Sequence, residues 1–107
     1  MEIVTPHQAL EMVQNGSAHG IDVREIDEWD LGHFDLFTLN PLSTFDSDGL
    51  PTDKPIIFIC RSGKRSGQAC INVEPSGRKV FNMEGGMLAW QTAGLPMSAK
   101  HGSPQIS

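Results

Sequence analysis

The 107-residue chain contains no tyrosine, only two cysteines and no long apolar run. A membrane-spanning helix needs about 18 or more consecutive apolar residues, which excludes a membrane protein. Two cysteines do not make the disulfide framework of a small secreted domain. The amino terminus has neither the basic segment nor the apolar core of a secretory signal, so we expect a cytoplasmic protein.

Basic residues are also scarce, since 8 Lys and Arg stand against 13 Asp and Glu and give a formal net charge of −5. Nine of the acidic residues lie within residues 22–53, where Arg24 is the single base. This balance argues against nucleic acid, whose binding depends on neutralising many phosphates. Three of the bases gather in one loop, at Arg61, Lys64 and Arg65, and suit a small anion better.

Metal-ligand spacing is absent as well, so we expect no metal and no cofactor. The histidines are too far from one another and from either cysteine to suggest a zinc site: His7, His19, His33 and His101.

Short apolar segments alternate with helical patterns along the chain. Thr5, Pro6 and Gln8 form a capping-box start for a helix that runs to about Asn15. Further helices are expected at residues 25–31, 66–73 and 87–92. The expected strands are residues 2–4, 20–24, 36–39, 55–59 and 79–82. The alternation predicts an α/β fold, with an open, mostly parallel five-stranded sheet and helices on both of its faces.

One domain is expected to cover residues 1–97. The polar residues 98–107 show no periodicity and are expected to form a loose tail.

The most informative segment is the loop from Cys60 to Ser66, which directly follows the apolar run 56–59. Such a run predicts a parallel strand buried on both faces. Gly63 permits unusual backbone dihedrals and Ser66 is a good helix N-cap, so we expect a tight loop between a strand and a helix. This geometry aims backbone N–H groups and a helix dipole at one point.

Cys60 is the candidate nucleophile at that point. A helix amino terminus and neighbouring cations lower the pKa of a thiol and favour the reactive thiolate. Arg61 and Lys64 are expected to draw in an anionic substrate, which the loop amides, including those at Ser62 and Gly63, would bind. A buried structural cysteine is the alternative, but it does not explain the basic loop.

Arg65 is expected to form a salt bridge that shapes the loop rather than to bind substrate. Asp22 is the leading partner, and Arg24 and Glu28 are expected to pair locally on a solvated face. Cys70 is expected to be a small buried hydrophobe, with a resolving thiol as the alternative.

Three blocks of sequence together resemble a single-domain rhodanese over nearly the whole chain. The first is Ile21-Asp22-Val23-Arg24-Glu25 with Glu28-Trp29 and Gly32-His33-Phe34. The second is the loop of residues 60–66. The third is Val80-Phe81-Asn82-Met83-Glu84-Gly85-Gly86 with Trp90 and Gly94-Leu95-Pro96. Residues 35–39 depart from the family pattern, because they are bulkier than the usual small residues.

The resemblance implies a sulfurtransferase that moves a sulfane sulfur from thiosulfate or a similar donor, as a persulfide on Cys60, to cyanide or another thiophile. It implies substrate binding by residues 61–65 and support from Asp22, Arg24 and Ser66. Related dual-specificity phosphatases carry a Cys-x5-Arg loop, whereas Cys60 to Arg65 is the shorter Cys-x4-Arg, whose smaller ring of amides suits one sulfur atom.

Two alternatives stay open at this point. The protein could be a sulfur carrier or interaction module that receives persulfide from a partner protein, docked through the acidic residues 22–53. Those residues are otherwise a solvated face. Phosphatase or arsenate-reductase chemistry is the third reading, and the short loop argues against it.

Overall fold

The computed structural model describes residues 1–107 as five strands, four α-helices and three short 3-10 helices. The strands are Glu2–Val4 (β1), His19–Asp22 (β2), Phe37–Leu39 (β3), Ile56–Ile59 (β4) and Val80–Met83 (β5). The α-helices are Pro6–Gln14 (α1), Ile26–Leu31 (α2), Lys64–Val73 (α3) and Gly86–Thr92 (α4). The 3-10 helices are Leu42–Thr44 (η1), Ser47–Gly49 (η2) and Glu74–Ser76 (η3). None of the helices has the length and apolar character needed to cross a membrane.

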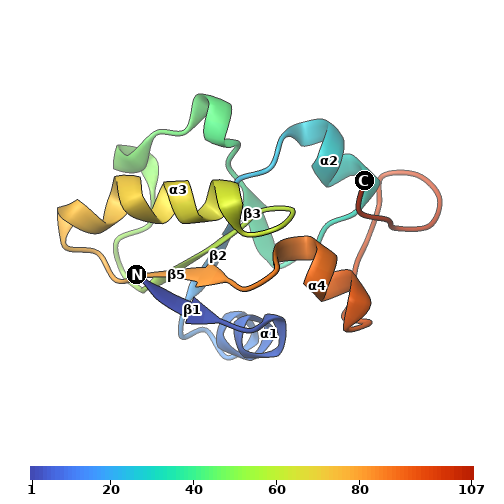
Figure 1. Ribbon diagram of the computed structural model, residues 1–107, viewed down its shortest axis with the longest axis horizontal. Helices are drawn as coiled ribbons and strands as arrows, with labels where there is room; N and C mark the ends of the chain where they lie inside the picture. Colours follow the sequence, from blue (N-terminus) through green and yellow to red (C-terminus); the bar gives the residue numbers. More distant parts are fainter.

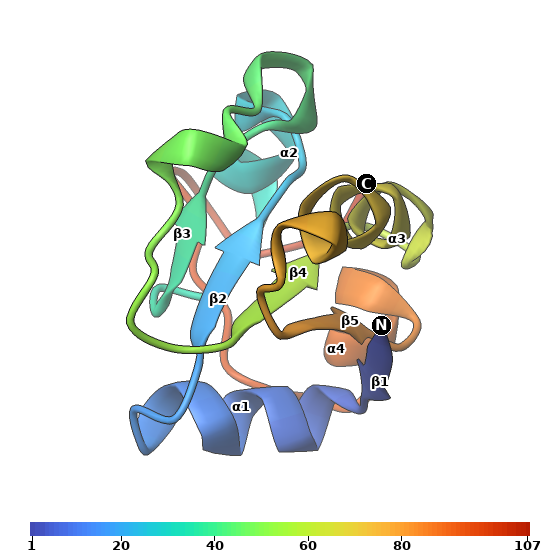
Figure 2. The same cartoon turned by 90° about the vertical axis from the view of Figure 1, so that its left-hand side faces the viewer.

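The strands form one sheet in the order β1-β5-β4-β2-β3 (Figure 2). Every neighbouring pair is parallel, which confirms the predicted five-stranded sheet. β4 is the central strand, with Ile59 opposite Asp22 of β2 and Phe58 opposite Asn82 of β5. The carboxyl ends of parallel strands lie at one edge of the sheet, so the loop after β4 begins at the middle of that edge.

Alternate residues of β4 face opposite sides of the sheet, and each side has its own core. Ile57 and Ile59 lie in a cluster with Ala9 of α1 and Met87 and Trp90 of α4. The other two side chains of β4, Ile56 and Phe58, lie in a second cluster. It includes Ala69, Cys70 and Val73 of α3. Figure 1 shows α3 and α1 on opposite sides of the sheet, which confirms helices on both faces.

Local signals in the sequence account for the ends of several helices. Thr5 and Gln8 form the predicted capping box at the start of α1. The prediction for α3 is wrong at its start, because the helix begins at Lys64 with Gly63 as N-cap. Gly63 has φ +103°, a conformation that favours glycine. Ser66 therefore lies in the first turn of α3, where its hydroxyl makes contacts other than a cap.

Among the bulky residues after Phe34, Phe37 lies in the core while Leu36 is exposed. Phe37 begins β3, and a Cβ atom at Gly20 of the neighbouring strand would overlap its ring. Phe34, Phe37 and Trp90 form an aromatic cluster whose ring centroids lie 4.9–5.1 Å apart. The departure from the family pattern is thus absorbed by a glycine beside it.

Residues 98–107 run along α2 toward the loop that follows β4. Ser98 and His33 exchange backbone hydrogen bonds of 2.8 and 2.9 Å, and the Gln105 N–H donates to the Leu31 carbonyl at 2.9 Å. The Ile106 N–H donates to the side-chain oxygen of Gln91 at 3.0 Å. The mobility expected for residues 98–107 stays a prediction.

Candidate active site

Cys60 is held at the carboxyl end of β4 by the start of α4. The Met87 N–H donates to the Cys60 carbonyl at 2.8 Å, and the Leu88 N–H donates to the Arg61 carbonyl at 3.0 Å. Gly86 makes this approach possible, because its φ is +59° and a Cβ atom there would overlap the Cys60 and Arg61 backbone. The Gly85–Gly86 pair of the sequence therefore allows the start of α4 to pack directly against the backbone of the cysteine loop.

The Cys60 sulfur accepts hydrogen bonds in an otherwise apolar environment. The residue is 1% exposed, and its Sγ accepts from the Gly63 N–H at 3.0 Å and from the Ser66 hydroxyl at 3.3 Å. Burial raises the pKa of the Cys60 thiol, but hydrogen bonds from the Ser66 side chain and from the backbone N–H groups of Ser66, Gly63 and Ser62 outweigh it. The net result is a pKa below the ordinary value, which favours the thiolate.

The direction of this shift agrees with the expectation from the sequence, and so does one of its expected causes, the backbone N–H groups of the loop and the helix start. The Ser66 hydroxyl is a further donor. The adjacent cations were expected to act on the thiol, whereas Arg61 and Lys64 are exposed and make no hydrogen bond to Cys60. Arg61 Nε instead donates to the Ser107 carbonyl. Ser62 is also exposed, and Lys64 makes no ion pair. Both cations are thus displayed around the loop, where they can meet an anion arriving from solvent.

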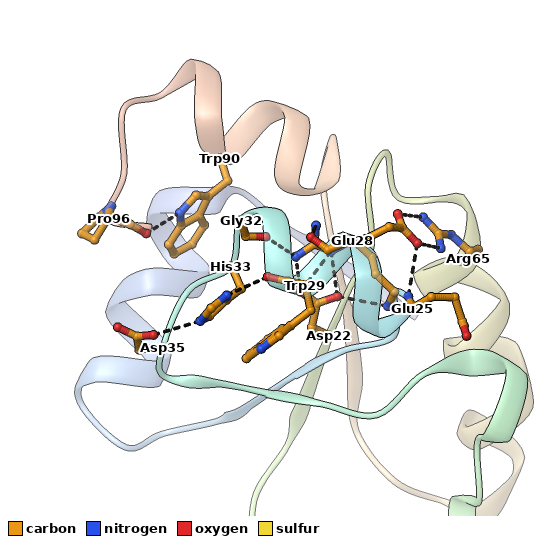
Figure 3. Close-up of polar contacts among 11 residues, drawn as sticks. Asp22, Glu25, Glu28, Trp29, Gly32, His33, Asp35, Arg65, Trp90 and Pro96 are labelled. Carbon is orange, nitrogen blue, oxygen red and sulfur yellow. Dashed lines mark hydrogen bonds and ion pairs between the residues drawn. The ribbon is translucent and has the colours of Figure 1, made fainter. Parts of the chain in front are cut away.

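Arg65 forms the expected salt bridge, but with a different partner. Its guanidinium donates to both carboxylate oxygens of Glu28 at 2.6 and 2.7 Å, which links α3 to α2 (Figure 3). Hydrogen bonding from Arg65 holds the pKa of Glu28 below its usual value, although burial opposes this. The prediction that Asp22 pairs with Arg65 is wrong, and so is the local Arg24–Glu28 pair.

Asp22 is already occupied by Arg24, in a buried ion pair. Arg24 Nη2 donates to Asp22 Oδ2 at 2.8 Å, and Nε donates to Oδ1 at 3.0 Å. The same Nη2 also donates to the Gly32 carbonyl at 2.8 Å. Both side chains are almost completely buried, so Arg24 does not lie on a solvated face as predicted. The pair fixes the turn between β2 and α2, which carries Glu28 to Arg65.

Asn82 of β5 is a residue of the site that the sequence reasoning did not single out. Its Nδ2 donates to the Gly63 carbonyl at 2.9 Å, and its Oδ1 accepts from the Ser66 hydroxyl at 2.5 Å. A signal existed in the sequence, because Asn82 is the one polar residue of an apolar strand. Buried amides need hydrogen-bond partners, and the nearby cysteine loop supplies them.

The arrangement can support nucleophilic chemistry at sulfur. It joins a buried thiol of lowered pKa, donors aimed at its sulfur and exposed cations on the surrounding loop. Nowhere in the structure do three or more His, Cys, Asp or Glu side chains meet in a way that could hold a metal ion.

Known proteins share both the sequence pattern and the fold of this chain. The family model for the Rhodanese-like domain matches residues 5–93. The chain is 31% identical over 101 residues to the thiosulfate sulfurtransferase GlpE of Actinobacillus pleuropneumoniae, covering 92% of this chain and 94% of that protein. It is 33% identical over 93 residues to the probable adenylyltransferase/sulfurtransferase MoeZ of Mycobacterium tuberculosis.

The match to the second relative covers 81% of this chain but only 24% of that longer protein. Among solved structures, a rhodanese-related protein from Thermoplasma volcanium superposes with a TM-score of 0.83 at 25% identity. That superposition covers 92% of this chain and 98% of the other. The family model spans strands β2 to β5, the cysteine loop and the Gly85–Gly86 pair at the start of α4, and the chain therefore belongs to the rhodanese-like domain family.

Proposed function

We propose that the protein is a sulfurtransferase that carries a sulfane sulfur on Cys60, with thiosulfate or a similar anion as donor. The observation that carries the proposal is the pair of hydrogen bonds to Cys60 Sγ from the Gly63 N–H and the Ser66 hydroxyl. These donors favour a thiolate, which is the form of cysteine that attacks sulfur. The similarity to a thiosulfate sulfurtransferase over nearly the whole chain supports the same donor.

The proposed reaction has two balanced steps. The Cys60 thiolate attacks the outer sulfur of thiosulfate, the S–S bond of the donor breaks, and sulfite leaves with the bonding electron pair. A thiophile such as cyanide then attacks the outer sulfur of the Cys60 persulfide. The persulfide S–S bond breaks, its electron pair returns to Cys60 Sγ, and thiocyanate leaves.

Each predicted site residue has a role in this scheme. Arg61 and Lys64 attract the anionic donor, and the amides of Ser62 and Gly63 contribute donors near the reacting sulfur. Arg65 supports the loop through Glu28. The supporting set comprises Asp22, Arg24 and Ser66, of which the first two hold the β2–α2 turn and the third contacts Sγ.

Mass spectrometry after incubation with thiosulfate tests the reaction class. We expect the native protein and Cys70→Ala to gain the mass of one sulfur atom, and Cys60→Ser to gain none. Absence of the adduct from native protein whose Cys60 still reacts with an alkylating agent would refute the proposal. Hydrolysis of an aryl phosphate by the same protein would point to phosphatase chemistry instead.

A sulfur carrier that receives its persulfide from a partner protein is the second candidate. The similarity to one part of a larger adenylyltransferase/sulfurtransferase favours it, because the chain matches only 24% of that protein. The acidic residues of α2, among them Asp27 and Asp30, would then form the docking surface. Faster loading of Cys60 from a persulfidated donor protein than from thiosulfate would support this role over the first.

A further inference from the structure

A series of hydrogen bonds leads inward from the sulfur of Cys60. It connects the Ser66 hydroxyl, the Asn82 amide and the Gly63 carbonyl. Cys60 Sγ and Ser66 Oγ are 3.3 Å apart, and Ser66 Oγ and Asn82 Oδ1 are 2.5 Å apart. Asn82 Nδ2 continues the series to the Gly63 carbonyl at 2.9 Å. Ser66 is 0% exposed and Asn82 is 9% exposed, so bulk water does not compete for these contacts.

The orientation of the Asn82 amide follows from its partners. The Gly63 carbonyl can only accept a hydrogen bond, so the NH₂ group of Asn82 must face it. The amide oxygen must therefore face Ser66. The Gly67 N–H also donates to the Gly63 carbonyl at 3.0 Å, so this carbonyl is held from two sides.

The Ser66 hydroxyl consequently has one proton and two acceptors. It can donate to Asn82 Oδ1 or to Cys60 Sγ, and rotation of the O–H bond exchanges the two without moving a heavier atom. A thiolate accepts a hydrogen bond far better than an uncharged sulfur does, because bonds to ions are roughly twice as strong. The choice between the two acceptors thus depends on the charge of Cys60.

We propose that the Ser66 hydroxyl follows the charge on Cys60. It donates to Sγ while that sulfur is a thiolate, and to Asn82 Oδ1 while that sulfur is uncharged. Asn82 is the positioning residue of this switch, because it supplies the alternative acceptor and fixes it in place. The part of the proposal that concerns turnover rests on the proposed sulfurtransferase function, whereas the part that concerns the thiolate does not.

The switch would act on the two steps of sulfur transfer in opposite ways. In the loading step the Cys60 thiolate becomes the uncharged inner sulfur of the persulfide, and the hydroxyl turns to Asn82. In the unloading step the electron pair of the breaking S–S bond returns to Sγ, and the hydroxyl turns back to stabilise the departing thiolate. A stabilised thiolate is the better leaving group but the weaker nucleophile.

Thiolate absorbance during a pH titration tests the switch, in a Cys70→Ala background that leaves one thiol. We expect Ser66→Ala to raise the pKa of Cys60 by about one pH unit. Ser66→Thr, which keeps a hydroxyl, should restore most of the shift. Ser76→Ala is the matched control, because that hydroxyl bonds to the Val73 carbonyl at the far end of α3 and should change nothing.

Asn82→Leu separates positioning from simple structural support. With the competing acceptor removed, the hydroxyl has only Sγ left, so the pKa of Cys60 should fall. The same substitution in a Ser66→Ala background should leave it unchanged. A rise in both backgrounds would overturn the proposal, since a merely structural Asn82 would act in that way. If Ser66→Ala does not fold, the sign of the Asn82→Leu shift decides alone.

Separate measurement of the two steps gives the second readout. At a pH where Cys60 is fully ionised, Ser66→Ala should release sulfite from thiosulfate about threefold faster and pass sulfur to cyanide about threefold more slowly. Equal slowing of both steps would overturn the switch. Failure of the native protein to form any persulfide would overturn the proposed function instead, while the titration would still report on the hydroxyl.

Discussion

Two thiols of this domain lie in the same hydrophobic cluster and are about equally buried, at 1% exposure for Cys60 and 0% for Cys70. Their surroundings nevertheless shift them in opposite directions. Burial raises the pKa of Cys70 to about 11. Cys60 meets the same penalty, but donors from the loop and from Ser66 outweigh it and bring its pKa below the ordinary value.

The contrast shows that burial by itself does not decide in which direction the pKa of a cysteine shifts. Cys70 lies inside α3, where backbone N–H groups bond to helix carbonyls, and burial outweighs the single backbone hydrogen bond that its thiol receives. Cys60 precedes the helix, where the loop and the first turn have N–H groups to spare. The thiol of lowered pKa is therefore distinguished by its place at a helix start, and the apolar cluster around it keeps water from competing with the donors.

The largest effect that tests the contrast is the ionisation of each thiol alone. Cys60→Ser, which keeps Cys70, should show thiolate absorbance only as the pH approaches about 11. Cys70→Ala, which keeps Cys60, should ionise below the range of an ordinary cysteine. At pH 7 a pKa of about 11 leaves about one Cys70 in ten thousand ionised.

The chain suits this titration because it has no tyrosine, whose ionisation also changes the ultraviolet absorbance. Coincident curves for the two variants would remove the contrast altogether. A denatured sample of each variant is the control, since both thiols should then ionise together in the ordinary range.

The dependence of stability on alkaline pH is the next largest effect. The folded-state pKa of Cys70 lies above its ordinary value of 9.0, at about 11, so the folded chain holds a proton that the unfolded chain loses. The contribution is fully present below pH 9.0 and disappears as the pH rises through about 11. Two pH units correspond to about 3 kcal/mol.

Urea unfolding of the native protein and of Cys70→Ala should reveal this loss. Cys70→Ala lacks the buried thiol, so its free energy of unfolding should fall less between neutral pH and pH 11. A constant difference between the two proteins at every pH would mean that Cys70 costs nothing to ionise in place. Groups that titrate in both proteins cancel in the comparison.

Much of the fold could be predicted because the signals are local. The apolar run Ile56–Ile59 identified the central strand, and the Thr5–Gln8 capping box identified the start of α1. The position of Cys60 at the end of that strand followed from the same run. These elements are determined by residues that are close together in the sequence, so a local sequence pattern is enough to predict them.

The partners of the charged and polar groups could not be read in this way. Arg24 turns back onto Asp22, two positions before it, and so leaves Glu28 to Arg65. Ser66 is a residue type that is common at N-caps, but Gly63 is the N-cap of α3. The Ser66 hydroxyl instead donates to Asn82 Oδ1 in the interior. The partner of each such group depends on which side chains the fold brings together. For Arg24, the carboxylates of Asp22 and Glu28 are both close in sequence, and the sequence does not distinguish them.

A smaller effect is expected at the ion pair that joins the cysteine helix to α2. Glu28→Gln should lower the free energy of unfolding at neutral pH by about 1 kcal/mol, because it weakens a two-fold contact that is partly exposed. The pKa of Glu28 is lowered in the folded state, so the contribution is present above the ordinary value and lost as the pH falls through the lowered one.

Unfolding of Glu28→Gln and of native protein should therefore differ at neutral pH and converge in acid. Asp27→Asn is the matched control on the same helix, because Asp27 is exposed and makes no ion pair. The titration of Cys70 should be the same in Glu28→Gln as in native protein. A shifted pKa of Cys70 would show that the ion pair affects the packing of the whole of α3, and not just of the end next to the cysteine loop.

The smallest effect on the fold, under about 0.5 kcal/mol, is expected for Lys64→Ala, since Lys64 is exposed and has no ion pair. Its charge should matter only to the anionic donor, so KM for thiosulfate should rise by up to about fivefold at low salt and the difference should shrink as salt is added. Arg61→Ala should act in the same direction. An unchanged KM in both variants would mean that backbone amides alone hold the donor. The same hydrogen-bonding groups that set Cys60 apart from Cys70 would then also account for substrate binding, and the cations of the loop would have no part in it.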